Sequence, residues 1–167
     1  RPTVPSWSGE ARSRSRELSS ALLELIGHCI VALRKEMDPR MILMDAYGLS
    51  NIVANSIARH LEEHSIDSFQ VPDPNRILVE QIISGGHPTY MITTCRGRGF
   101  NTALGYFLAG LAEANGISVI EMSFDENGLL LRTSQEIEPR DMYDSFKSQN
   151  HIEVIERYII NTQIFAC

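Results

Sequence analysis

The sequence predicts an α+β fold: N-terminal helices, then a mostly antiparallel sheet unit ordered strand–strand–helix–strand–strand (ββαββ), then C-terminal helices. Two patterns support this prediction. In the central segment, β-branched apolar runs come in pairs separated by Gly- or Asn-containing turns, and one apolar helical stretch stands between the two pairs. On both sides of this segment, apolar residues recur at steps of three and four, which is typical of amphipathic helices.

The central segment contains four predicted strands and one helix. Residues 76–84 and 89–95 form the first pair of strands, and Gly-Gly-His-Pro at 85–88 is the predicted turn between them. Residues 117–124 and 129–132 form the second pair. Their turn ends in Asn127-Gly128, a pair that favours turns with positive φ. The helix between the pairs ends at Asn115-Gly116 and carries one apolar face, made of Leu104, Phe107, Leu108 and Leu111.

The flanking segments are predicted to be helical. A long amphipathic helix covers 12–37 with Ser13 or Ser15 as its N-cap, a short helix follows at 40–47, and another begins after Ser50 and ends near residue 65. A Pro-rich connector at 71–75 leads into the sheet. Residues 139–147 and 151–160 are the predicted C-terminal helices. We therefore expect an N-terminal arm and helical part at 1–70 and a sheet unit with C-terminal helices at 71–167, together one excised domain fragment.

Composition indicates a globular protein of a reducing compartment. Hydrophobic residues make up 43% of the 167 residues, and the three cysteines are widely spaced, so we expect free thiols and a cytoplasmic location. No apolar run has the ~20 residues that a membrane-spanning helix needs. The chain starts at Arg1 and stops after an apolar stretch, so we expect it to be a segment of a longer protein.

Several catalytic motifs are absent from the sequence. It contains no phosphate-binding Gly-x-x-x-x-Gly-Lys-Ser/Thr loop, no Gly-x-Ser-x-Gly nucleophile turn and no Cys-x-x-Cys pair. His60-Leu-Glu-Glu-His64 fits the inverted zinc-protease pattern, in which two histidines one helical turn apart bind one metal. A zinc hydrolase needs a third protein ligand, and no residue stands out as that ligand. The alternative is a solvated, charged helix end.

The loop Arg96-Gly97-Arg98-Gly99 is the strongest binding candidate. It combines glycines, two guanidinium groups and the N-terminus of the following helix, features that suit contact with a phosphate backbone. The alternative is a structural turn whose arginines pair with nearby acids. The net charge of −6 disfavours a dedicated nucleic-acid domain, but Arg12 and Arg14 add positive charge near the N-terminus. The acidic residues concentrate elsewhere in the sequence, at Glu62-Glu63, Asp125-Glu126 and residues 136–144.

Two further side chains have competing interpretations. Trp7, the only tryptophan, lies on the N-terminal arm, where it could stack on a nucleobase or anchor the arm by packing. Cys95 lies beside two arginines that could lower the pKa of its thiol, although most free cysteines are buried small hydrophobes.

Four motifs resemble the large-helicase-related (Lhr) group of superfamily-two ATP-dependent DNA helicases. Pro-Ser-Trp-Ser-Gly-Glu at 5–10 is similar to the family's Pro-x-Trp-x-Gly-Glu element. The segment 71–80 is similar to its Val-Pro-Asp lead into a strand, and 124–131 to its Asp-Asp-Gly turn and strand. Arg96-Gly-Arg98-Gly-Phe-Asn101 resembles its Phe-Gly-x-Arg-Val-Asn element, with Arg96 replacing the aromatic residue and with one residue added.

This resemblance implies an accessory domain that follows the motor and winged-helix domains of the same parent chain and helps complete a channel for single-stranded DNA. The parent would be an ATP-dependent helicase that uses Mg²⁺ and ATP, acts in DNA repair and moves along single-stranded DNA or an RNA–DNA hybrid. The segment itself would hold no cofactor or metal and would not be an enzyme. Trp7 would stack, and Arg98, with Arg96, Arg12 and Arg14, would contact phosphates. A protein-interaction or scaffolding module is the alternative, and a zinc hydrolase through His60 and His64 is the third hypothesis.

Overall fold

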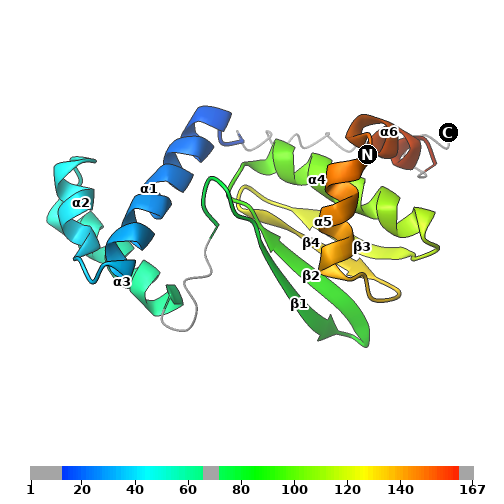
Figure 1. Ribbon diagram of the computed structural model, residues 1–167, viewed down its shortest axis with the longest axis horizontal. Helices are drawn as coiled ribbons and strands as arrows, with labels where there is room; N and C mark the ends of the chain where they lie inside the picture. The colour runs from blue at the N-terminus through cyan, green and yellow to red at the C-terminus, as the bar shows by residue number, and fades with distance from the viewer. Residues whose placement is uncertain (1–12, 66–71, 162–167) are drawn as a thin grey trace, which may run out of the picture.

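The computed structural model describes residues 13–65 and 72–161 and confirms the α+β fold. Its sheet is four-stranded and entirely antiparallel, in the order β1-β2-β4-β3, and helices stand at both ends of the described chain. The β1–β2 and β3–β4 hairpins therefore pair through β2 and β4. The helix between them in sequence packs on one face of the sheet. In Figure 1, helices α1–α3 gather to one side, while α4 and α5 lie over the sheet.

The elements follow the predicted order. The helices are α1 (Arg16–Arg34), α2 (Pro39–Asp45), α3 (Asn51–Ser65), α4 (Arg98–Ala114), α5 (Pro139–Ser148) and α6 (His151–Asn161). The strands are β1 (Leu78–Ser84), β2 (His87–Thr93), β3 (Val119–Phe124) and β4 (Gly128–Thr133). Ser15 is the N-cap of α1, because its hydroxyl accepts a hydrogen bond from the Leu18 N–H at 3.2 Å.

The first hairpin is tighter than predicted. His87 and Pro88 belong to β2 and pair with Ser84 and Ile83, so only Gly85 and Gly86 form the turn. Both glycines have positive φ, 60° and 79°, as a two-residue turn between twisted antiparallel strands requires. The four-residue turn expected from the sequence is therefore wrong, because the hydrogen-bonded pairing continues to the two glycines.

The second turn depends on a carboxylate and not on a left-handed backbone. The Asp125 carboxylate accepts hydrogen bonds from the Asn127 and Gly128 N–H groups, each at 2.7 Å. The positive φ expected at Asn127-Gly128 is wrong, since neither residue has a positive φ. Glycine is needed at 128 for another reason: a Cβ there would lie 2.3 Å from the carbonyl oxygen of Ile92 on β2.

Buried apolar side chains form two clusters. The first joins the three N-terminal helices, and its members are Cys29, Leu43, Ala54, Ala58 and Leu61. The second lies between the sheet and α4–α6, and it includes all four α4 residues predicted for the apolar face: Leu104, Phe107, Leu108 and Leu111. The clusters fall on either side of residue 70, and the division into parts at 1–70 and 71–167 stays a prediction. Within the described residues, none of the helices has both the length and the apolar character needed to cross a bilayer.

We expect Gly128→Ala to destabilise the protein by about 3 kcal/mol, at the upper end of overpacking changes, because the new methyl group would collide with the β2 backbone. The matched control is Gly99→Ala in the first turn of α4, where a Cβ meets no atom within 4 Å. This control should leave the free energy of unfolding unchanged or raise it by up to about 1 kcal/mol. Urea denaturation measures both, and equal stabilities for the two variants would contradict the close approach of β4 to β2.

Candidate functional site

The loop between β2 and α4 is held against the β3–β4 turn by backbone hydrogen bonds. The N–H groups of Thr94 and Cys95 both donate to the Asn127 carbonyl, at 2.8 and 2.7 Å. The Gly97 N–H donates to the Glu126 carbonyl at 3.1 Å. The arginine-bearing loop is therefore fixed by contacts with a segment about 30 residues later in the sequence.

A buried asparagine reinforces this contact. Asn101, in the first turns of α4, is fully buried, and its side-chain nitrogen donates to the Asp125 carbonyl at 2.8 Å. Its side-chain oxygen accepts a hydrogen bond from the Thr94 hydroxyl, which in turn accepts one from the Arg96 N–H at 3.1 Å. Asn101 therefore joins the loop, the helix and the turn in one polar network.

The carboxylate of Glu126 caps the N-terminus of α4. The N-cap residue, Gly97, has no side chain to cap the helix, and its φ of 91° is accessible mainly to glycine. In place of a Gly97 side chain, the Glu126 carboxylate accepts hydrogen bonds from the backbone N–H groups of Arg98 at 3.3 Å and Arg14 at 3.0 Å. Glu126 lies 28 residues after Arg98 in the sequence, and the hairpin turn brings its carboxylate to the start of α4.

Arg14 and Arg96 have internal partners. The Arg14 guanidinium donates from Nη2 to the Asn127 side-chain oxygen at 2.7 Å. The Arg96 guanidinium donates from Nη2 to the Pro74 carbonyl at 2.6 Å and lies 5.5 Å from the centre of the Phe100 ring. Both arginines thus hold neighbouring segments against the loop, and neither partner is an acidic side chain.

Arg98 differs from the other two described arginines of the site. Its side chain is exposed, and its guanidinium makes no hydrogen bond or ion pair with the residues of 13–65 and 72–161. The structure therefore brings Arg14, Arg96 and Arg98 to one locus, and of these three guanidinium groups only that of Arg98 has no partner among the described residues. Trp7 and Arg12, the other predicted binding residues, lie outside the described residues.

The Cys95 thiol is not activated. The side chain is buried, and this burial raises the pKa of the thiol above its ordinary value, outweighing the opposite effect of Arg14. Proximity to arginines therefore does not make Cys95 a low-pKa nucleophile, and the interpretation as a buried small hydrophobe is the one that the structure favours. Its φ of 54° shows that the loop turns sharply at this residue.

The zinc hypothesis finds no third ligand in the described part of the chain. His60 lies on the exposed side of α3, and the side chain of His64 is outside the described set. No group of three or more His, Cys, Asp or Glu side chains within that set is arranged to hold a metal ion. Because this search does not include the His64 side chain, the zinc hypothesis stays a prediction.

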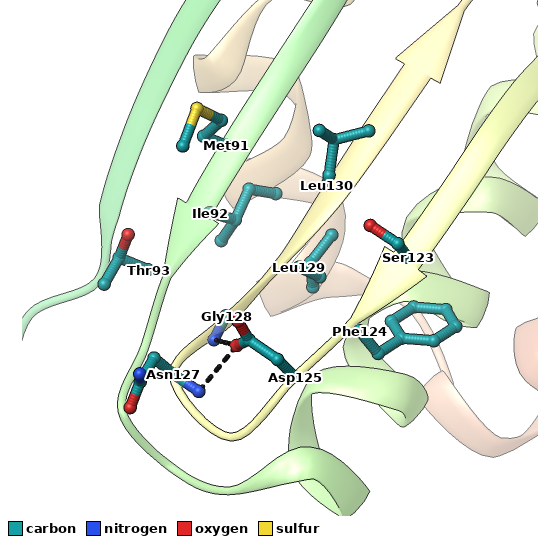
Figure 2. A pocket seen from close by; sticks show the side chains of 10 residues that line it. All are labelled: Met91, Ile92, Thr93, Ser123, Phe124, Asp125, Asn127, Gly128, Leu129 and Leu130. Atoms are coloured by element: carbon teal, nitrogen blue, oxygen red, sulfur yellow. Dashed lines mark hydrogen bonds between the residues drawn. The ribbon is translucent and has the colours of Figure 1, made fainter.

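Figure 2 shows a shallow pocket of about 310 Å³ where β2, β3 and β4 meet the β3–β4 turn. Met91, Thr93, Ser123 and Leu130 project at this surface. Among the lining residues that the structure describes, Asp125 carries the one ionisable side chain, and its carboxylate accepts hydrogen bonds within the turn.

Comparisons with known proteins place this geometry in a family. The family model described as "DEAD/H associated" matches residues 71–167, which is more than half of the chain. The chain belongs to the DEAD/H-associated family. The match covers β1–β4 and α4–α6, so the loop, the turn and the network around Asn101 all lie inside it. A search of curated proteins gave no match.

The fold is also similar to part of a solved helicase structure. It matches Mycobacterium smegmatis helicase Lhr bound to ssDNA and AMP-PNP, with a TM-score of 0.69 and 18% sequence identity. The match covers 99% of this chain and 21% of that helicase, so the chain spans about a fifth of its length. The family is thus shown to be DEAD/H-associated, and the fold is that of a segment of an Lhr helicase. The roles of individual residues stay predictions.

We expect Asn101→Ala to lower the free energy of unfolding by about 2–3 kcal/mol, because the Asp125 carbonyl and the Thr94 hydroxyl would each lose a buried partner. Asn115→Ala is the control: this residue lies exposed at the other end of the same helix, where its side chain bonds only the Leu111 carbonyl. Its loss should cost under about 1 kcal/mol. Chemical denaturation compares the two, and similar losses would show that the buried network does not hold the loop.

Proposed function

We propose that this chain is an accessory domain of an ATP-dependent DNA helicase of the Lhr type and helps to bind the single strand along which the helicase moves. The DEAD/H-associated family and the shared fold with a segment of a helicase studied with ssDNA support this proposal. The observation that carries it is the exposed guanidinium of Arg98, fixed at the start of α4 without an internal partner among the described residues.

Arg98 is the main phosphate contact in this proposal. A guanidinium forms two parallel hydrogen bonds to a phosphate, which fixes orientation as well as charge. Glu126 already neutralises the positive end of the α4 dipole, so the side chain of Arg98, and not the helix N-terminus, supplies the attraction. We expect Arg14 and Arg96 to contribute less, because their guanidinium groups bond to Asn127 and Pro74.

The remaining parts of the proposal concern the parent protein. Trp7 would stack on a base and Arg12 would contact a phosphate, and both lie outside the described residues. ATP and Mg²⁺ would bind to motor domains elsewhere in the parent, since this sequence has no phosphate-binding loop. The net charge of −6 predicts that the chain by itself binds a strand weakly. RNA–DNA hybrid is a second substrate under the same proposal.

Arg98→Ala tests the proposal directly. Labelled single-stranded DNA is titrated at several salt concentrations, and the variant should bind more weakly and lower the slope of log affinity against log salt by about 0.7, the contribution of one phosphate contact. Arg140→Ala removes the same charge from α5, where the side chain is 89% exposed and 4.0 Å from the Asp144 carboxylate. This control should retain the wild-type slope. Identical slopes for both variants would remove Arg98 from the strand-binding surface.

A protein-interaction module is the second candidate function, and β1 is the observation that favours it. β1 is an edge strand of the sheet, and it has exposed apolar side chains on both faces. Val79 and Ile83, on the face that the helices cover, are 38% and 67% exposed, and Ile82, on the opposite face, is 49% exposed. Such an edge pairs readily with another strand. A second copy fits, because antiparallel pairing centred on Gln81 places Val79 opposite Ile83 of the other copy and keeps the two Glu80 carboxylates from facing each other.

Disulfide trapping tests this pairing. In a Cys167→Ser background, Gln81→Cys should cross-link two copies, because opposed residues in antiparallel strands lie about 4.5–5.5 Å apart between Cα atoms, within disulfide reach. Ser84→Cys is the control, since in this register the two copies of residue 84 lie about 20 Å apart. A monomer in sedimentation with no cross-link at residue 81 would contradict the self-association of β1.

A further inference from the structure

A groove runs along the exposed side of α4 from Arg98. The groove is shallow and open to solvent, with a volume of about 440 Å³. The lining residues from α4 include Arg98, Thr102 and Tyr106, which are four residues apart and therefore lie on one helix face over about 12 Å. Ser13, just before α1, and Ile155 of α6 complete the walls.

The chemistry of the lining matches a nucleotide. It offers one guanidinium from Arg98, hydroxyl groups from Ser13 and Thr102, and the phenol ring of Tyr106, and none of the lining residues that the structure describes is acidic. In a chain with a net charge of −6, a groove whose described lining has no carboxylate, beside an arginine with no partner among the described residues, exposes a phosphate to little local repulsion.

The ring of Tyr106 is held by other aromatic side chains. The Phe124 ring packs edge-on against it with a centroid distance of 5.7 Å, and the Tyr158 ring lies at 5.9 Å with an interplanar angle of 36°. Gly105 allows this close packing, since a Cβ there would lie 2.3 Å from a Phe124 ring atom. The half-buried Tyr106 ring is thus already oriented in the free protein. Stacking of a base on it therefore costs little side-chain entropy.

We propose that this groove is a subsite for one nucleotide of a single strand, in which Arg98 binds the phosphate, Thr102 and Ser13 bond to phosphate or sugar oxygens, and a base stacks on Tyr106. This inference rests on the function proposed above and adds the base contact. A single strand is the matching form of nucleic acid, because its unpaired bases can turn outward onto an aromatic ring while the backbone follows the charged part of the groove.

Two substitutions of Tyr106 and two DNA ligands test the stacking contact. Tyr106→Leu keeps an apolar side chain against Phe124 and Tyr158 but removes the ring, and Tyr106→Phe keeps the ring. On single-stranded DNA, Tyr106→Leu should bind roughly 5- to 150-fold more weakly, the range for loss of one base stack, while Tyr106→Phe should bind like the wild type. On an abasic strand of the same length, all three proteins should bind equally, because that ligand has no base to stack.

Arg98→Ala, measured on the same ligands, separates this inference from the proposed function. It should weaken binding to both strands and lower the salt slope, whereas Tyr106→Leu should leave the slope unchanged. If Arg98→Ala weakens binding but Tyr106→Leu binds the base-containing strand like the wild type, the nucleotide subsite is overturned and the proposed function stands. Equal losses for Tyr106→Leu on both strands would also overturn the subsite, because the ring would then act only through packing. If neither variant changes binding, both proposals fail.

Discussion

The contact between the β2–α4 loop and the β3–β4 turn is the constraint on which the rest of this structure depends. Three carbonyl oxygens and one carboxylate of the turn accept hydrogen bonds from the loop and the start of α4. The donors are the N–H groups of Thr94, Cys95, Gly97 and Arg98 and the side-chain amide of Asn101. Buried backbone groups must be paired, so the direction in which the chain leaves β2 and begins α4 is fixed by residues of the second hairpin.

The same contact extends to the N-terminal helices. Arg14 precedes α1, and it donates its backbone N–H to Glu126 and its guanidinium to Asn127. The Ser19 hydroxyl, buried on α1, faces Gly97: a Cβ at 97 would lie 3.2 Å from it. The Glu126 carboxylate therefore fixes the starts of both α1 and α4. Because it bonds the first N–H group of α4, the N-cap residue Gly97 does not need the polar side chain that an N-cap ordinarily has.

Hydrogen bonds within the protein already occupy several of the charged groups near the loop, and this limits which groups can contact a ligand. Glu126 occupies the position that an external anion would take at the start of α4, and Arg14 and Arg96 support the loop. Among the described residues, this surface carries the Arg98 guanidinium, followed along α4 by the Thr102 hydroxyl and the Tyr106 ring. A surface of this kind suits weak contact with a single strand, strengthened when other parts of a longer protein hold the same strand.

Local periodicity in the sequence determined the elements, their order and the apolar face of α4, because burial of one helix face or strand face leaves a repeat of 3.6 or 2 residues. Four sequence motifs, and not the periodicity, suggested the resemblance to an Lhr-type helicase; the family model shows the DEAD/H-associated family, and the solved structure shows a shared fold. The sequence did not place Glu126 at the loop or separate Arg98 from Arg14 and Arg96, and it did not single out Tyr106, the base contact proposed above. Those outcomes depend on contacts between residues that are far apart in sequence, and only the packing of the second hairpin against the start of α4 brings them together.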